Sequence, residues 1–213
     1  MIIMIIELSI IKLSQEVNMS VADRSIDPRI IERAKEEFLQ KGFLDASLQE
    51  ICKNAGVTTG ALYKRFKGKE ELFCALVEST VQDLEEVVRQ KSVLPATLTD
   101  EQLKKAWDMD REYMQWWFDY LYDRYDEMRL LLVFSDGTKY ANFEHEWVES
   151  MSHTTYAYYK EAQRRGLTKT DISEKELHVM LSSFWTAICE PLIHGFTKEE
   201  AGRISDLMCG LFD

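Results

Sequence analysis

Apolar residues recur along most of the chain at the spacing of one helical face. The first such stretch follows Asp27-Pro28, a pair that caps and opens helices, and its apolar positions run from Ile30 to Leu39. We expect an all-α fold. The pattern places helices near 28–42, 48–55, 60–66, 69–91, 99–122, 126–135, 141–165, 173–194 and 197–212.

The second and third predicted helices are short and closely joined. Ser47 and Glu50 have the spacing of a capping box, in which each side chain binds an amide at the other's position. Gly56 supplies the conformation for a sharp turn, and Thr58 or Thr59 can cap the next helix. This spacing is typical of a helix-turn-helix, whose second helix enters the DNA major groove. An ordinary αα-hairpin inside a helical bundle has the same spacing.

The distribution of charge favours DNA binding over the hairpin alternative. The chain has a formal net charge of −11, yet residues 20–75 hold ten Lys and Arg against nine Asp and Glu. Basic residues gather at the end of the third predicted helix, where they can neutralise phosphates, and small residues at its start allow close approach to bases. The predicted DNA-contacting residues are Ser47, Gln49, Thr58, Thr59, Gly60, Tyr63, Lys64, Arg65, Lys67 and Lys69.

A series of short motifs runs in fixed order through this segment. They are Lys41-Gly42-Phe43, Ser47-Leu48-Gln49-Glu50-Ile51-Cys52, Ala55-Gly56-Val57, Gly60-Ala61-Leu62-Tyr63 and Phe66-Lys67-Gly68-Lys69-Glu70-Glu71-Leu72. Together they resemble the DNA-binding module of the TetR family of bacterial transcriptional regulators. Two positions depart from the family pattern. Cys52 stands in place of the usual alanine, and Arg65 stands where tyrosine, histidine or asparagine is common.

The resemblance implies a three-helix N-terminal DNA-binding module followed by a helical ligand-binding and dimerisation domain. We place the module at 20–75 and the second domain at 76–213. Residues 1–19 are expected to be a non-native or disordered extension. The codons for Gln15 to Met19 can contain a ribosome-binding purine tract just ahead of a start codon, so native translation is expected to begin at Met19. The apolar run at the N-terminus is shorter than the roughly 20 residues of a membrane-spanning helix, so neither anchor nor signal peptide is expected.

Aromatic residues are concentrated in the first half of the second domain. Four of them fall at i, i+3, i+4 and i+7, which is one helical face. The resemblance places the effector pocket among these helices, so we expect an aromatic or hydrophobic small-molecule effector; packing in the core is the alternative for each residue. The predicted ligand-binding residues are Tyr113, Trp116, Trp117, Tyr120, Trp147, His153, Tyr156 and Phe184.

The last two predicted helices carry apolar stripes. In the TetR family such helices pair with their copies in a second subunit, so the resemblance implies a homodimer; packing within one subunit is the alternative. The predicted dimerisation residues are Leu181, Trp185, Ile188, Leu192, Ile204, Leu207, Met208 and Leu211.

Several other kinds of site have no support in the sequence. The four cysteines and four histidines lack metal-ligand spacing, so we expect no metal, no cofactor and a reduced cytoplasmic compartment. No nucleophile motif or phosphate loop indicates catalysis. The expected function is a dimeric repressor that a small-molecule effector releases from a palindromic double-stranded DNA operator. The alternative is a helical small-molecule-binding or enzymatic protein with a structural helix-turn-helix.

Overall fold

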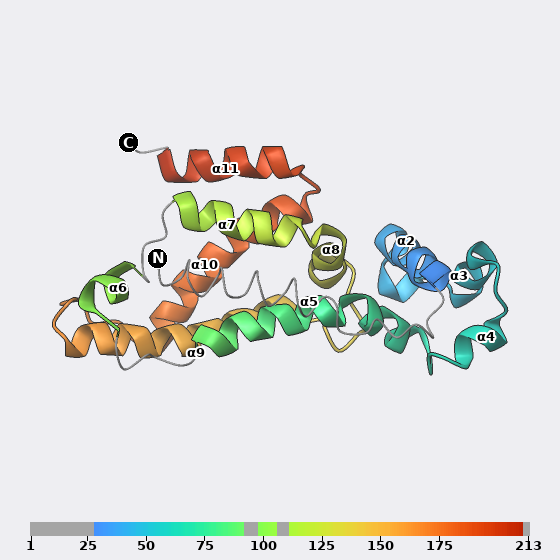
Figure 1. Cartoon of the computed structure of the whole chain (residues 1–213), viewed down its shortest axis with the longest axis horizontal. Helices are drawn as coiled ribbons and strands as arrows, with labels where there is room; N and C mark the ends of the chain where they lie inside the picture. The colour runs from blue at the N-terminus through green and yellow to red at the C-terminus, as the bar shows by residue number, and fades with distance from the viewer. Residues whose placement is uncertain (1–27, 92–97, 106–110, 211–213) are drawn as a thin grey trace. The chain divides into compact units, whose positions relative to one another are not determined.

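The computed structural model describes residues 28–91, 98–105 and 111–210, and these form helices and their connections (Figure 1). The predicted extension 1–19 lies outside the described residues. The helices are α2 (Pro28–Asp45), α3 (Leu48–Ala55), α4 (Thr59–Tyr63), α5 (Lys69–Lys91), α6 (Asp100–Lys105), α7 (Arg111–Tyr122), α8 (Tyr125–Val133), α9 (Phe143–Arg164), α10 (Glu174–Ile193) and α11 (Lys198–Gly210). The all-α prediction is confirmed for the part of the chain that the structure describes.

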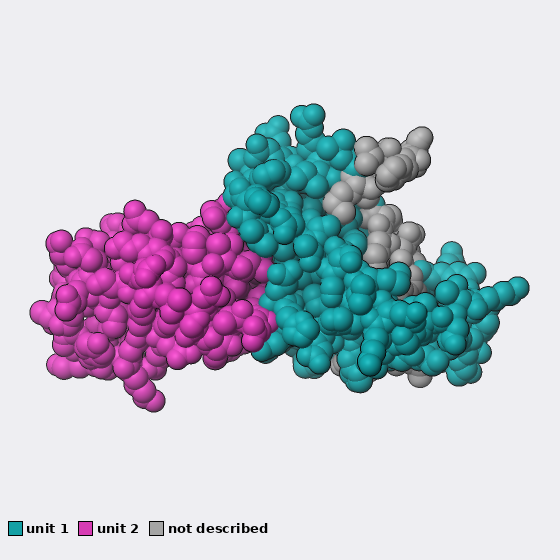
Figure 2. All heavy atoms as spheres, turned by 180° about the vertical axis from the view of Figure 1, so that it is seen from behind, with its two compact units in different colours: residues 1–14, 84–123, 144–213 teal, residues 15–83, 124–143 magenta. Residues whose placement is uncertain are grey.

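The chain forms two compact units, coloured separately in Figure 2. One unit, which we call the N-terminal unit, combines residues 15–83 with residues 124–143. The other, the C-terminal unit, combines the described residues of 84–123 and 144–213. The boundary that the sequence placed at residue 76 does not anticipate that 124–143 joins the helix-turn-helix.

Three phenylalanine rings form the centre of the N-terminal unit. Phe38 and Phe43 lie on α2. Phe73 lies on α5 and meets Phe38 edge to face, with ring centres 5.2 Å apart. All three are buried. Burial of rings of this size is the main favourable term in packing α2 against α5.

Residues 124–143 pack against α2 and α5 through backbone and charged contacts. The amide of Phe43 donates to the carbonyl of Phe134 at 3.0 Å. The ammonium of Lys35 binds the carboxylate of Glu127 at 2.8 Å. Helix α8 is therefore part of the body that carries the helix-turn-helix.

In the C-terminal unit, α7 packs against α10 and α11. Its buried face includes Trp117, Phe118 and Leu121. The sequence predicted one helix over 99–122, whereas the structure describes two, α6 and α7, and residues 106–110 between them lie outside the described residues.

Candidate functional site

The turn between α3 and α4 has the conformation that its sequence predicts. Gly56 follows α3 with a φ of 67° and a ψ of 33°, which is the left-handed region that favours glycine. The amides of Gly56 and Val57 donate to the carbonyls of Lys53 and Cys52 at 3.2 and 3.0 Å. The hydroxyl of Thr58 caps α4 by accepting from the amide of Ala61 at 3.2 Å. These bonds satisfy backbone groups that the two helix ends would otherwise leave unpaired.

The predicted capping box at the start of α3 is only half formed. The hydroxyl of Ser47 accepts from the amide of Glu50 at 3.4 Å, as expected. The carboxylate of Glu50 instead binds Lys53 at 3.2 Å, and the amide of Ser47 donates to the buried carboxylate of Glu37 at 3.0 Å. The prediction of a reciprocal box was wrong because the interior of the unit supplies a carboxylate from α2.

The basic residues after α4 have no carboxylate partner among the described residues. Lys64, Arg65 and Lys67 are all exposed, and within the described part of the chain none of their side chains forms an ion pair. By contrast, Lys41 and Lys53 in the same unit are each bound to a glutamate, at 2.7 and 3.2 Å. The end of α4 therefore presents uncompensated positive charge to solvent, as a phosphate-binding surface must.

The other predicted contact residues around α4 divide by their environment. Tyr63 is 56% exposed, and Thr59, Gly60 and Gln49 are exposed as well. The hydroxyls of Ser47 and Thr58 already accept capping bonds from backbone amides. Ser47 and Thr58 lie at the N-terminal ends of α3 and α4, as predicted. Each hydroxyl caps its helix, so DNA contact by these two residues stays a prediction.

Lys69 has a structural role that the sequence did not indicate. Its ammonium donates to the carbonyls of Leu44 and Ala46 at 2.8 and 3.0 Å and lies 4.8 Å from the ring centre of Phe43. The start of α5 is thereby fixed to the connection between α2 and α3. Two of the three ammonium donors are used in these bonds, so contact with DNA stays a prediction for Lys69.

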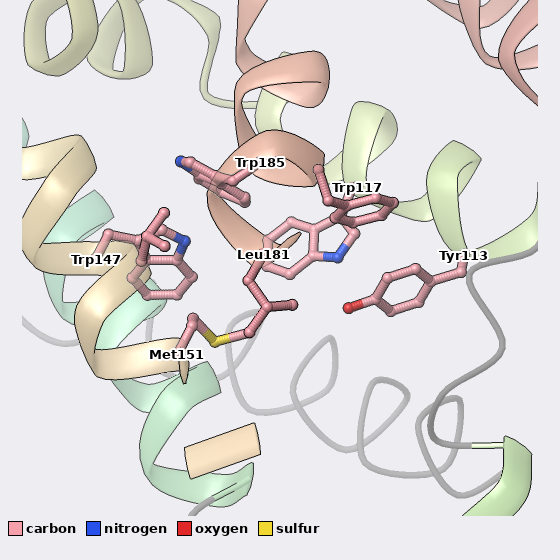
Figure 3. A pocket seen from close by; sticks show the side chains of 8 residues that line it. Tyr113, Trp117, Trp147, Met151, Leu181 and Trp185 are labelled. Atoms are coloured by element: carbon pink, nitrogen blue, oxygen red, sulfur yellow. The ribbon is translucent and has the colours of Figure 1, made fainter. Parts of the chain in front are cut away.

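A pocket lies between α7, α9 and α10 in the C-terminal unit (Figure 3). Its cavity volume is about 30 Å³, and the cavity opens to solvent. Among the described residues its lining has no charged side chain and consists of Tyr113, Trp117, Trp147, Val148, Met151, Leu181, Phe184 and Trp185. Pockets of this composition bind small apolar or aromatic molecules.

Ring packing shapes the walls of the pocket. The rings of Tyr113 and Phe184 are nearly parallel, with centres 6.0 Å apart and planes 21° apart. Trp117 meets Trp185 edge to face, with ring centres 5.2 Å apart. These contacts between α7 and α10 make a rigid wall against which a flat ligand can lie.

Comparison with known proteins places the helix-turn-helix in a family. A family model described as "Bacterial regulatory proteins, tetR family" matches residues 30–76, which run from α2 into α5. Residues 30–76 therefore form a DNA-binding module of the TetR family. The match includes the turn at Gly56 and the exposed basic residues after α4.

Relatives with curated names are also transcriptional regulators. The chain is 46% identical over 57 residues to the HTH-type transcriptional regulator SrpR of Pseudomonas putida, a match that covers 27% of each chain. It is 25% identical over 200 residues to the HTH-type transcriptional repressor AcnR of Corynebacterium glutamicum, covering 90% of this chain and 97% of the relative. The higher identity thus extends over about a quarter of each chain, and the lower identity extends over nearly the whole length.

Solved structures of the TetR family share the fold. PfmR of Thermus thermophilus is 17% identical, with a TM-score of 0.57 over 85% of this chain and 97% of that one. FadR of Bacillus subtilis in complex with stearoyl-CoA is 17% identical, with a TM-score of 0.52 over 87% of this chain and 99% of that one. Identities this low show a common fold.

Half of the predicted ligand-binding residues line the pocket: Tyr113, Trp117, Trp147 and Phe184. The other four do not. Trp116 stacks on Tyr120 with ring centres 5.1 Å apart, the hydroxyl of Tyr156 donates to the carbonyl of Ile172, and His153 binds Glu174 at the surface. The predicted face of α7 spans four aromatic residues at i, i+3, i+4 and i+7. Only Tyr113 and Trp117, at i and i+4, line the pocket.

Half of the predicted dimerisation residues are buried within one chain. Leu181 and Trp185 line the pocket with 8% and 5% of their surface exposed, and Ile188 and Leu192 have no exposed surface. Ile204 is half-buried and Leu207 is 53% exposed. The side chain of Met208, and all of Leu211, lie outside the described residues.

Sequence reasoning missed other residues of these surfaces. Val148 and Met151 follow Trp147 on α9 by one and four residues, so the helical period starting from Trp147 could have indicated Met151. On α10, Val179 and Met180 are 62% and 58% exposed. Both lie outside the buried stripe of α10.

Two further features were searched for in the described residues. No group of three or more His, Cys, Asp or Glu side chains there is placed to hold a metal ion. None of the described helices combines the length and the apolar character that crossing a membrane requires.

Proposed function

We propose that this protein is a dimeric, ligand-responsive transcriptional repressor that binds a palindromic DNA operator in the cytoplasm. The observation that carries the proposal is the surface at the end of α4. Lys64, Arg65 and Lys67 project unpaired positive charge beside a helix-turn-helix in a chain of net charge −11. A helix-turn-helix that served only to fold the protein would need no such surface.

The proposed DNA contacts divide into two kinds. Lys64, Arg65, Lys67 and the hydroxyl of Tyr63 suit phosphates, which position the protein but carry no sequence information. Thr59 and Gly60 at the start of α4 are exposed and small, so they allow the helix to approach base edges in the major groove. Operator specificity would then depend on the start of α4, and affinity on its end.

A dimer is required by this mode of binding. Two recognition helices reach successive major grooves only if they are about 34–36 Å apart, which one chain with one helix-turn-helix cannot provide. We assign the dimer contact to the exposed face of α10 at Val179 and Met180 and to Leu207 on α11. Apolar side chains this exposed gain by burial against a second copy.

The effector is proposed to be an uncharged aromatic or hydrophobic molecule bound in the pocket of the C-terminal unit. Among the residues that the structure describes, no charged side chain lines this pocket to neutralise an ionised ligand. Helix α5 contributes residues up to Asp83 to the N-terminal unit and residues from Leu84 to the C-terminal unit, which makes it the natural connection between pocket and DNA. The effector releases DNA only to the extent that it binds the DNA-free state more tightly.

A gel shift with DNA from upstream of the protein's own gene tests the proposal. We expect a discrete complex that an aromatic effector dissociates. Failure to shift any neighbouring intergenic DNA at low salt would favour a helical small-molecule-binding protein whose helix-turn-helix is structural.

A further inference from the structure

Two histidines from different helices lie edge to face in the C-terminal unit. His145 lies on α9 and His178 on α10, with ring centres 5.8 Å apart and planes at 79°. His145 is exposed and His178 is half-buried, so the pair can be reached from solvent. The pair could not be predicted from the sequence, because 33 positions separate the two residues.

A hydroxyl on α9 fixes the protonation pattern of His178. The hydroxyl of Ser152, a buried residue, donates to the carbonyl of Val148 at 2.6 Å, so its only hydrogen is used. Its oxygen lies 3.2 Å from Nδ1 of His178 and can only accept there. The neutral ring of His178 therefore carries its hydrogen on Nδ1 and a lone pair on Nε2.

This arrangement is the one that metal-binding histidines use. A metal-bound imidazole usually donates its other ring N–H to a neighbouring acceptor, which fixes the ring and its tautomer. Ser152 supplies that acceptor for His178. The hydroxyl of Ser152 is itself held by the backbone carbonyl of Val148, one turn earlier on α9.

The distance between the rings suits a shared ion. With a metal–nitrogen bond of about 2.1 Å, the ring centre lies about 3.2 Å from the metal, so two imidazoles on one ion have centres about 5.2 Å apart at a tetrahedral angle and about 6.4 Å apart when opposite. The observed 5.8 Å falls between these limits. Glu144, Glu146 and Glu149 lie within four positions of His145 and add negative charge that attracts a cation.

We propose that His145 and His178 bind one divalent transition-metal ion, with Nε2 of His178 as a ligand and Ser152 as its positioning residue. Imidazole suits Zn²⁺, Cu²⁺ and Ni²⁺, and Zn²⁺ is the probe chosen here. No third His, Cys, Asp or Glu is in place within the described residues, so water completes the coordination. The ion would join α9 to α10, the helices that supply six of the eight residues lining the pocket.

Titration calorimetry with ZnCl₂ tests the proposal on the full chain without a histidine tag. One ion per chain should bind, and either His145→Ala or His178→Ala should abolish binding. His153→Ala is the matched control, because His153 is another α9 histidine whose partner is a single glutamate, and it should bind Zn²⁺ as the wild type does.

A variant of Ser152 separates positioning from packing. Ser152→Ala should weaken Zn²⁺ binding about 10- to 100-fold while the helical circular dichroism signal stays unchanged. His145→Ala changes an exposed side chain, so the variant should fold as the wild type does. A loss of Zn²⁺ binding in this variant can therefore be assigned to the missing imidazole. The proposal is overturned if the wild type takes up no Zn²⁺, if His145→Ala binds as tightly as the wild type, or if His153→Ala loses binding equally. None of these results bears on operator binding.

Discussion

The backbone amide of Ser47 donates a hydrogen bond to the carboxylate of Glu37 at 3.0 Å. Glu37 is a charged residue with only 6% of its side chain exposed, and Lys41 binds the same oxygen at 2.7 Å. The contact joins α2 to the first residue of the helix-turn-helix. Burial raises the pKa of this carboxyl, but its bonds with Lys41 and Ser47 outweigh that effect and hold the pKa below its ordinary value.

Glu37→Ala should destabilise the protein by about 1–3 kcal/mol, because a buried amide and an ammonium lose their acceptor. Glu36→Ala is the matched control, since Glu36 is the neighbouring residue and pairs with Arg33 at the surface. Its cost should stay within about 0.5 kcal/mol. Urea unfolding followed by circular dichroism measures both; equal losses would mean that Glu37 has no special role.

The free energy of unfolding that Glu37 contributes should also depend on pH. A carboxyl whose pKa is depressed by folding stabilises the protein above its unfolded pKa, and this contribution is lost as pH falls through the folded pKa. The advantage of the wild type over Glu37→Ala should therefore be full at neutral pH and shrink below about 4.3, the ordinary glutamate pKa. A difference that grew in acid would contradict the assignment.

Lys64→Gln and Arg65→Gln should each weaken operator binding and reduce the slope of log K against log salt by about 1, because each removes one phosphate contact. Thermal stability should not change, since neither side chain is ion-paired within the described residues. Lys160→Gln is the control, an exposed lysine on α9 in the C-terminal unit. Fluorescence anisotropy across a salt series measures the slopes. A slope unchanged in both α4 variants would remove this surface from the interface.

Phe184→Ala should weaken effector binding about tenfold or more and leave operator affinity unchanged, because it removes one of two stacked rings from the pocket wall. Tyr156→Ala is an informative control. The sequence placed Tyr156 in the pocket, whereas the structure places it against the segment before α10. Quenching of tryptophan fluorescence by an aromatic ligand such as naphthalene compares the two. A larger loss in Tyr156→Ala would support the interpretation from sequence.

Met180→Glu should convert the dimer to a monomer and abolish operator binding, because it places charge in the proposed apolar contact. Ala157→Glu is the control, an exposed position on α9. Light scattering gives the mass of each variant, and circular dichroism checks its fold. A Met180→Glu protein that stays dimeric would move the interface elsewhere.

The sequence predicts local structure correctly where contacts between neighbouring residues determine it. Gly56 and Thr58 shape the turn through bonds to residues within four positions, so the helix-turn-helix could be predicted. Glu37 and Lys69 could not, because their partners lie 10 to 25 positions away and only the fold brings them together. The same limit explains why the sequence placed Leu181 and Trp185 in the dimer contact, whereas the structure places them in the wall of the pocket. An apolar stripe shows that a helix face is buried, but not whether it is buried by its own chain or by another.

The most direct test of the central claim is the stoichiometry of the protein on DNA from upstream of its gene. Light scattering of the purified complex should give two chains on one palindromic duplex, and an aromatic ligand that quenches tryptophan fluorescence should release both. A protein that binds this ligand, remains folded and shows no affinity for any neighbouring intergenic duplex at low salt would contradict the account.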